Sequence, residues 1–279
     1  MDALPNFFVI GAMRSATTSL CDSLALHPRV FMSTPKELDF FSNDDVFARG
    51  FDWYRGVFAA ANGAVAIGEG STNYTKQLLY PRAAERLAKY RPEAKLIYIV
   101  RHPLRRIESH WLHLLREGDD LPTLAAAIAQ RPEMIDISLY WKQIGAYRRL
   151  FADDRILTVF AEDLKASPAK VIAGICEFLG IGILSEAAGA RVHSNAYPEV
   201  GVDGAALRLL RKVPGAQALA ALQPAGLREV WRKLKKPQPE AKSAWTDELR
   251  AQVMRRLEPD TREFLAFYGK PADFWQLQS

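Results

Sequence analysis

The sequence predicts an α/β fold in which helices flank a central parallel β-sheet as a three-layer sandwich, followed by a helical C-terminal region. Short continuous apolar runs, typical of strands buried on both faces, alternate with stretches of helical periodicity. The chain has 279 residues, of which 49% are hydrophobic and 25% charged, as expected for a globular protein with one large core. We therefore expect a single domain over residues 1–279.

Four apolar runs are the predicted strands. The first reads Phe-Phe-Val-Ile-Gly at residues 7–11, and the others span 65–69, 95–100 and 155–160. Helical patterns separate and follow them at 17–26, 80–90, 103–116, 138–151 and 168–180. Because each helix connects two strands, the strands are expected to run parallel.

Beyond about residue 200 the pattern becomes helical and basic, and prolines punctuate it. Two final helices are predicted at 246–257 and 260–268. The segment 191–240 is interpreted as an arm or lid on the acceptor side of the domain. The basic run from Arg228 to Lys236 raises the alternative of a nucleic-acid-binding module, but such runs are more often solvated helix faces, and no nucleic-acid partner is expected.

Charge and cysteine content narrow the class of protein further. The 37 basic and 32 acidic residues leave a net charge of +5, which suits a polyanionic ligand such as a nucleotide. The two cysteines, Cys21 and Cys176, lie in apolar helical patterns and are predicted to be buried thiols. The chain shows no signal-like N-terminus and no apolar stretch of about 18 residues, so a cytoplasmic protein without a transmembrane segment is expected.

The loop after the first predicted strand is the most informative segment. Residues 11–19 read Gly-Ala-Met-Arg-Ser-Ala-Thr-Thr-Ser, which places a short polar loop and a hydroxyl-rich helix start directly after a buried strand. The N–H groups and dipole of such a helix start attract an anion, and Arg14 adds positive charge. The sequence thus predicts a phosphate-binding loop.

A P-loop-like nucleotide kinase is the alternative for this loop. The motif GxxxxGK[ST] is not matched, because Ala16 and Thr17 stand where the second glycine and the lysine would be. The strand at 95–100 also ends in Val100 and Arg101 rather than in the acid that such enzymes use to hold magnesium.

The loop resembles the 5′-phosphosulfate-binding loop of sulfotransferases that use PAPS (3′-phosphoadenosine 5′-phosphosulfate), especially the heparan sulfate N- and 3-O-sulfotransferases and their bacterial relatives. That loop reads basic-x-Gly-Thr-Thr, and here an arginine replaces the usual lysine and an alanine replaces the glycine. The resemblance implies a P-loop-like fold, PAPS as the donor, and donor binding by Arg14, Ser15, Ala16, Thr17, Thr18 and Ser19.

Two further segments are similar to acceptor-side motifs of this family. Residues 35–41 read Pro-Lys-Glu-Leu-Asp-Phe-Phe and resemble its Glu-x-x-Phe-Phe element, which implies Glu37 as the catalytic base. From the residues alone, a solvated Lys-Glu pair is the commoner outcome. Residues 69–74 resemble a Glu-Lys-[ST]-Pro-x-Tyr segment but have Gly70 in place of the lysine, so the role of that lysine is either absent or supplied elsewhere, with Lys36 and Lys76 as the candidates. The implied catalytic residues are Glu37, Arg14 and Lys36.

The strand at 95–100 is followed by a motif similar to the family's Arg-[DN]-Pro sequence, with a serine eight residues after the arginine. Arg101 and Ser109 have that spacing, so the resemblance implies that they bind the 3′-phosphate of the donor. His102 replaces the acid of the motif. His102, His110 and His113 lack a carboxylate or thiol partner at ligand spacing, so no metal site is expected.

The resemblance covers about residues 6–182 and implies a sulfotransferase that works by single in-line displacement. The attacking group would be a hydroxyl or amine of a small-molecule, glycan or lipid acceptor. His102 and His110 are the next candidates for the base after Glu37. The sequence indicates neither the identity of the acceptor nor the oligomeric state.

Overall fold

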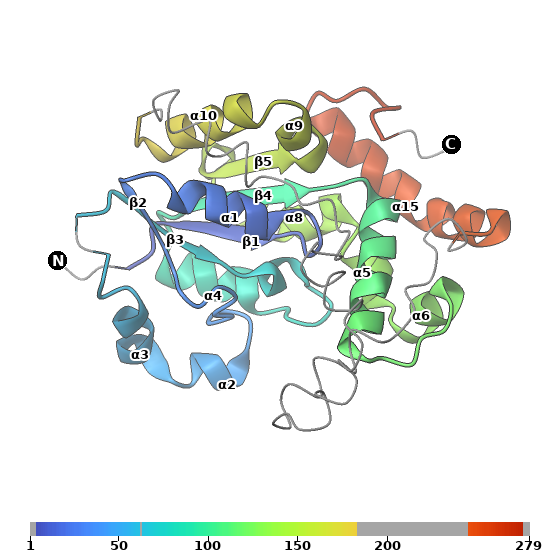
Figure 1. The fold of residues 1–279 in the computed structure, drawn as a ribbon, viewed down its shortest axis with the longest axis horizontal. Coiled ribbons are helices and arrows are strands. Elements are labelled where there is room, and N and C mark those ends of the chain that lie inside the picture. The colour runs from blue at the N-terminus through green and yellow to red at the C-terminus, as the bar shows by residue number, and fades with distance from the viewer. Residues whose placement is uncertain (1–3, 62, 183–244, 276–279) are drawn as a thin grey trace, which may run out of the picture.

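The centre of the protein is a parallel β-sheet with helices on both faces (Figure 1). The computed structural model describes residues 4–61, 63–182 and 245–275. Its strands are β1 (Phe7–Gly11), β2 (Val30–Met32), β3 (Ala66–Gly70), β4 (Lys95–Val100) and β5 (Ile156–Phe160). They form one five-stranded sheet in the order β2-β3-β1-β4-β5, and all neighbouring strands are parallel.

This topology confirms the four predicted strands to within one residue at each end. The prediction missed β2, which pairs with β3 at the edge of the sheet. It has only three residues, and all three are half-buried, so it lacks both the length and the apolar continuity by which a strand is found in a sequence.

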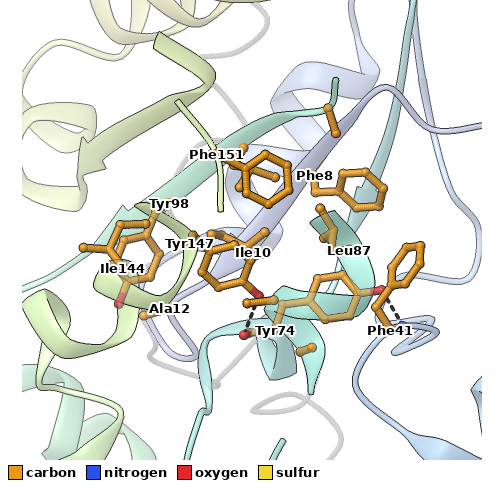
Figure 2. Close-up of a cluster of buried hydrophobic side chains, with 14 of the residues drawn as sticks. Phe8, Ile10, Ala12, Phe41, Tyr74, Leu87, Tyr98, Ile144, Tyr147 and Phe151 are labelled. Carbon is orange, nitrogen blue, oxygen red and sulfur yellow. Dashed lines mark hydrogen bonds between the residues drawn. The ribbon is translucent and has the colours of Figure 1, made fainter. Parts of the chain in front are cut away.

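Two layers of helices cover the sheet. Alternate residues of β1 point to opposite faces: Phe8 and Ile10 belong to one apolar cluster, and Phe7 and Val9 to another. The first cluster includes side chains of α4 (Ala83–Tyr90) and α8 (Tyr140–Arg148), and Figure 2 shows Leu87 and Tyr147 beside Phe8 and Ile10. The second cluster includes side chains of α1 (Thr17–Ala25) and α10 (Pro168–Leu179). The predicted three-layer arrangement is confirmed.

The predicted helices at 17–26, 80–90, 103–116, 138–151 and 168–180 are all present, with bounds shifted by up to three residues. The helix α5 (Pro103–Glu117) begins with Pro103, and α10 is followed by Gly180, whose φ of 76° is readily adopted only by glycine. Further helical segments that the sequence did not reveal are α2 (Asp44–Phe47), α3 (Gly50–Val57), η1 (Thr72–Thr75), α6 (Leu124–Gln130), α7 (Glu133–Asp136), η2 (Asp153–Arg155) and α9 (Ala161–Ala166).

The prediction of two C-terminal helices at 246–257 and 260–268 is wrong. A single helix, α15 (Asp247–Phe267), runs through Pro259. Tertiary contacts offset the cost of the interior proline: Phe264 is buried in the core, and the Asp260 carboxylate accepts hydrogen bonds from the backbone N–H groups of Trp141 and Lys142 at 2.9 and 2.8 Å. Those two N–H groups lie in the first turn of α8, so Asp260 fastens one helix to the other.

Both cysteines are buried thiols, as predicted. Within the described ranges, no helix combines the length and apolar character needed to cross a bilayer. The interpretation of 191–240 as an arm or lid, and the basic run from 228 to 236, lie outside the described residues.

Candidate active site

The candidate site lies at the carboxyl ends of β1, β3 and β4. The chain leaves β1 toward β2 and β3 on one side of the sheet, and later toward β4 and β5 on the other. In parallel α/β sheets a ligand crevice forms at such a reversal, because the loops on either side diverge there. The segments that follow these strands are residues 12–16, 71–75 and 101–102, and they hold four of the ten predicted site residues, namely Arg14, Ser15, Ala16 and Arg101.

The loop after β1 presents the start of α1. Arg14 and Ala16 have left-handed backbone conformations, with φ of 67° and 66°. Ala16 is the N-cap residue of α1 and makes no side-chain cap hydrogen bond, an arrangement that suits an anion at the helix start. Ser15 and Thr17 are buried, Ser19 is half-buried and Thr18 is exposed. The predicted loop thus lies between a buried strand and a helix start, and its role in donor binding stays a prediction.

Two predicted donor-binding arginines meet beside this loop. The Nε of Arg14 donates a hydrogen bond to the hydroxyl of Ser109 at 3.1 Å, and a guanidinium nitrogen of Arg101 lies 3.5 Å from the carbonyl oxygen of Arg14. Burial, and then the charges of Arg116 and Arg101, lower the pKa of Arg14. Within the described residues neither Arg14 nor Arg101 has a carboxylate at ion-pair distance. This crowding of unneutralised cations fits a polyanionic ligand.

Lys36 links the donor loop to the acceptor-side motif. Its ammonium group donates to the hydroxyls of Thr17 and Thr18 at 3.3 and 3.2 Å, and to the carboxylate of Glu37 at 2.8 Å. These contacts engage all three of its N–H donors. The ammonium group thus lies between the N-terminus of α1 and the predicted base.

Gly70 leaves the space that Lys36 occupies. A Cβ atom at position 70 would lie 3.3 Å from the Lys36 Cε and 2.8 Å from the sulfur of Cys21. The site therefore has one lysine against the end of β3, supplied by position 36. Lys76, the other candidate, is half-buried, and burial lowers its pKa while the charges of Glu37 and Asp39 oppose that effect.

Glu37 is held by the segment that follows β3. One carboxylate oxygen accepts hydrogen bonds from the N–H and the hydroxyl of Thr72, at 2.7 and 3.1 Å. Its backbone N–H donates to the carbonyl oxygen of Gly70 at 2.9 Å. The side chain remains 37% exposed, which leaves the carboxylate within reach of an incoming acceptor. Glu37 and Lys36 are therefore not the freely solvated pair that the residues alone would favour.

The histidines suit the role of base poorly. Burial, and then the neighbouring Arg105, lower the pKa of His102 to about 4. Burial, and then Arg106, lower the pKa of His110 to about 2, and an Arg106 nitrogen lies 3.5 Å from its Nδ1. Groups with such low pKa values are weak bases, so at neutral pH they would be poor at removing a proton from an acceptor. Within the described part of the chain, no three His, Cys, Asp or Glu side chains converge as metal ligands would.

Two residues around Glu37 were given no role by the sequence interpretation. Thr72 holds the carboxylate, and Asp39 lies two residues away in the same left-handed conformation, with φ of 57°. Burial, and then Glu37, raise the pKa of Asp39 to about 6. The polar stretch at 71–73 directly after a buried strand was the available signal, because residues at that position line the crevice.

Comparison with known proteins identifies the family to which these features belong. The family model described as the sulfotransferase domain matches residues 4–196. The chain is a member of the sulfotransferase domain family. This membership confirms the resemblance deduced from the loop and its companion motifs.

Two relatives belong to the heparan sulfate branch. This sulfotransferase domain is 27% identical over 201 residues to the human bifunctional heparan sulfate N-deacetylase/N-sulfotransferase 2, across 64% of the chain and 22% of that protein. It is 27% identical over 186 residues to the mouse heparan sulfate glucosamine 3-O-sulfotransferase 6, across 63% of the chain and 52% of that protein. The aligned part thus spans about a fifth and about half of their respective lengths.

Solved structures share the fold. A sulfotransferase from Alicyclobacillus acidocaldarius superposes with a TM-score of 0.69 at 21% identity, over 98% of this chain and 99% of the other. A mouse sulfotransferase in complex with PAP (the donor without its sulfuryl group) superposes with a TM-score of 0.51 at 17% identity, over 95% of this chain and 88% of that one. They confirm the predicted P-loop-like architecture.

Proposed function

We propose that this sulfotransferase domain transfers the sulfuryl group of PAPS to a hydroxyl or amine of an acceptor. The observation that carries the proposal is the position of Lys36, whose ammonium group contacts the Thr17 and Thr18 hydroxyls on one side and the Glu37 carboxylate on the other. Lys36 thereby joins a positively charged site for the anionic donor to the carboxylate proposed as the base. Transfer from an anionic donor to a hydroxyl or amine requires these two groups to be close together.

Donor binding is assigned to two groups of residues. The 5′-phosphosulfate would lie at the uncapped start of α1, among Arg14, Ser15, Ala16, Thr17, Thr18 and Ser19. Arg101 and Ser109 would hold the 3′-phosphate, with Arg101 able to form a two-pronged contact. PAPS, when bound, supplies the sulfuryl group and the bisphosphate leaving group. No metal is proposed, because the loop supplies its own cations where a kinase would use magnesium.

The proposed roles at the reacting centre follow from charge. Glu37 takes the proton of the attacking hydroxyl or amine, and Thr72 keeps its carboxylate pointed into the site. Lys36 and Arg14 offset the negative charge that builds up on the leaving side. Positioning and electrostatics, rather than covalent chemistry by the protein, supply the catalysis.

The acceptor is proposed to be a small molecule or a carbohydrate. The heparan sulfate relatives carry glycan substrates in their names, which makes a glycan the first class to test. A cytoplasmic location and an acceptor-side arm at 191–240 remain part of the same proposal.

The test is binding and transfer by the purified chain. Calorimetry should show that PAP binds more tightly than adenosine 5′-phosphosulfate, which lacks the 3′-phosphate. Radiolabelled PAPS offered with glycan, phenolic and lipid acceptors should yield a labelled product, and EDTA should leave the rate unchanged. Equal affinity for both nucleotides, or a rate that EDTA abolishes and magnesium restores, would favour the kinase alternative.

A further inference from the structure

Glu69 is a buried carboxylate without a cation. It lies at the end of β3 and is 0% exposed. Among the described residues, no lysine, arginine or histidine nitrogen lies within ion-pair distance of it. Its partners are instead three hydroxyl groups, those of Tyr54, Tyr74 and Ser71. Burying a carboxylate in this way is costly, so the arrangement calls for a reason beyond packing.

Two of these hydroxyls continue to the segment that carries Glu37. Ser71 donates to a Glu69 oxygen at 2.7 Å and accepts from the backbone N–H of Asp39 at 3.0 Å. Tyr74 donates to the same oxygen at 2.5 Å and accepts from the N–H of Phe41 at 3.3 Å, a contact visible in Figure 2. A hydroxyl group has one proton to donate. When Ser71 and Tyr74 donate theirs to the Glu69 carboxylate, the lone pairs of the hydroxyl oxygens remain to accept from the N–H groups of Asp39 and Phe41.

The segment held in this way is strained. Glu37 and Asp39 have φ of 59° and 57°, a region that residues with a Cβ atom adopt only when their surroundings enforce it. The N–H groups of residues 37, 39 and 41 donate in turn to the Gly70 carbonyl, the Ser71 hydroxyl and the Tyr74 hydroxyl. Two of these three hydrogen bonds are to hydroxyl groups that in turn donate to the Glu69 carboxylate.

We propose that Glu69 is a positioning residue for the base Glu37, acting through the Ser71 and Tyr74 hydroxyls on the backbone of residues 37–41. This inference rests on the proposed function, because it assumes that Glu37 is the base. Because Glu69 is 0% exposed, its effect on the reaction would be indirect.

The protonation state of Glu69 leaves this role intact. Burial raises its pKa to about 7, against the three hydroxyl donors, which lower it, while the charge of Asp39 adds to the rise. Tyr54 from α3, Tyr74 from η1 and Asp39 from the loop are among the titratable groups that act on it. Ser71 and Tyr74 donate to one carboxylate oxygen and Tyr54 donates to the other, so a proton on the Tyr54 side turns away only the Tyr54 hydroxyl. We therefore expect both relays, and with them the reaction rate, to change little as the pH drops through about 7.

The experiment compares variants by the release of sulfate from radiolabelled PAPS with water as acceptor, expressed per PAP-binding site measured by calorimetry. The double variant Ser71→Ala/Tyr74→Phe removes both hydroxyl relays and keeps the carboxylate, and Glu69→Leu removes the carboxylate. Tyr54→Phe is the matched control, because it deletes the third hydrogen bond to Glu69 and leaves both relays in place.

The relay variant and Glu69→Leu should each lower the rate per site about 10- to 100-fold while the PAP dissociation constant changes less than about twofold. Combining them should cause little further loss, because they break the same connection. Glu69→Gln, whose amide oxygen can still accept the two hydroxyl protons, should restore much of the rate. Tyr54→Phe should keep the wild-type rate.

The proposal is overturned if the relay variant retains the wild-type rate per site, or if Tyr54→Phe loses as much as the relay variant does. The second result would mean that any damage to this packed region slows the reaction. The proposed function fails separately, by a wild-type chain that binds no PAP or by a Glu37→Gln variant that releases sulfate at the wild-type rate.

Discussion

The Glu37 carboxylate accepts hydrogen bonds from Lys36, which also contacts the loop after β1, and from Thr72, which follows β3. A change at Glu37 therefore affects both sides of the site. Replacing it with glutamine keeps the shape, removes the base and removes a negative charge beside the anion site. Turnover should fall by about 10²- to 10⁴-fold, the usual contribution of a positioned base. PAP affinity, measured by calorimetry, should stay the same or increase.

The origin of that increase can be traced to Lys36. Lys36→Ala should weaken PAP binding, and in the double variant Lys36→Ala/Glu37→Gln the gain from the glutamine should disappear. Glu85→Gln, on the exposed face of α4, makes the same chemical change away from the site and should alter neither quantity. A Glu37→Gln variant with near-normal turnover would show that another residue acts as the base.

Arg101 is expected to read the 3′-phosphate. Arg101→Ala should weaken PAP binding by about 2–3 kcal/mol, the cost of a charge-assisted two-pronged contact, and leave adenosine 5′-phosphosulfate almost unaffected. Arg105→Ala is the matched control, because Arg105 is exposed on α5, four residues further along the chain, and its loss makes the same change in net charge. Equal losses for the two nucleotides would contradict the assignment.

At the scale of single elements, the start of α1 contains an alanine where the family has glycine. With φ of 66°, Ala16 is in a conformation that glycine adopts without steric cost. Ala16→Gly should therefore raise the free energy of unfolding by about 0.5–1 kcal/mol. This value is the relief of steric strain in the folded state minus the cost of a more flexible unfolded chain. Urea titration measures this, and a loss of stability would show that the methyl group makes a packing contact of greater value.

The junction between α15 and α8 depends on one carboxylate. Asp260 accepts hydrogen bonds from the first-turn N–H groups of Trp141 and Lys142, as a capping side chain does. Asp260→Ala should lower the free energy of unfolding by about 1–2 kcal/mol. Asp247→Ala, at the exposed start of α15, should cost less, and equal losses in thermal unfolding would mean that Asp260 contributes only to its own helix.

For the whole molecule, Glu69 should make stability depend on pH. Its folded pKa of about 7 lies above its ordinary value, so the folded state binds the proton more tightly than the unfolded state does. The resulting stability is complete below the unfolded pKa and is lost as the pH rises through the folded one. Between about pH 5.5 and about pH 8, the wild type should lose on the order of 2 kcal/mol relative to Glu69→Gln.

This difference isolates Glu69 from other titrating groups. The depressed pKa values of His102 and His110 act in the opposite direction, because the stability they contribute is lost as the pH falls below the ordinary histidine range. Both histidines are present in wild type and variant, so their effects cancel in the comparison. Parallel pH profiles of the two chains in urea titrations would show that Glu69 does not change its charge in this range.

The sequence by itself determined the local and repetitive features of this protein. A strand covered on both faces must be apolar throughout, so the sequence was sufficient to predict the buried strands at 7–11, 65–69, 95–100 and 155–160. The loop for which donor binding is proposed could be recognised because its residues, from Arg14 to Ser19, are contiguous. The positions of Glu37, Arg101 and Ser109 came from motifs of fixed spacing.

Only the tertiary structure decided what depends on contacts between distant segments. The edge strand β2 exists because β3 lies beside it, and α15 passes through Pro259 because the core and α8 hold both of its halves. The choice of Lys36 for the space beside Gly70, and the two hydroxyl relays from Glu69 to the Glu37 loop, join residues more than 25 positions apart. Their energies arise from three-dimensional proximity, which neither periodicity nor spacing encodes.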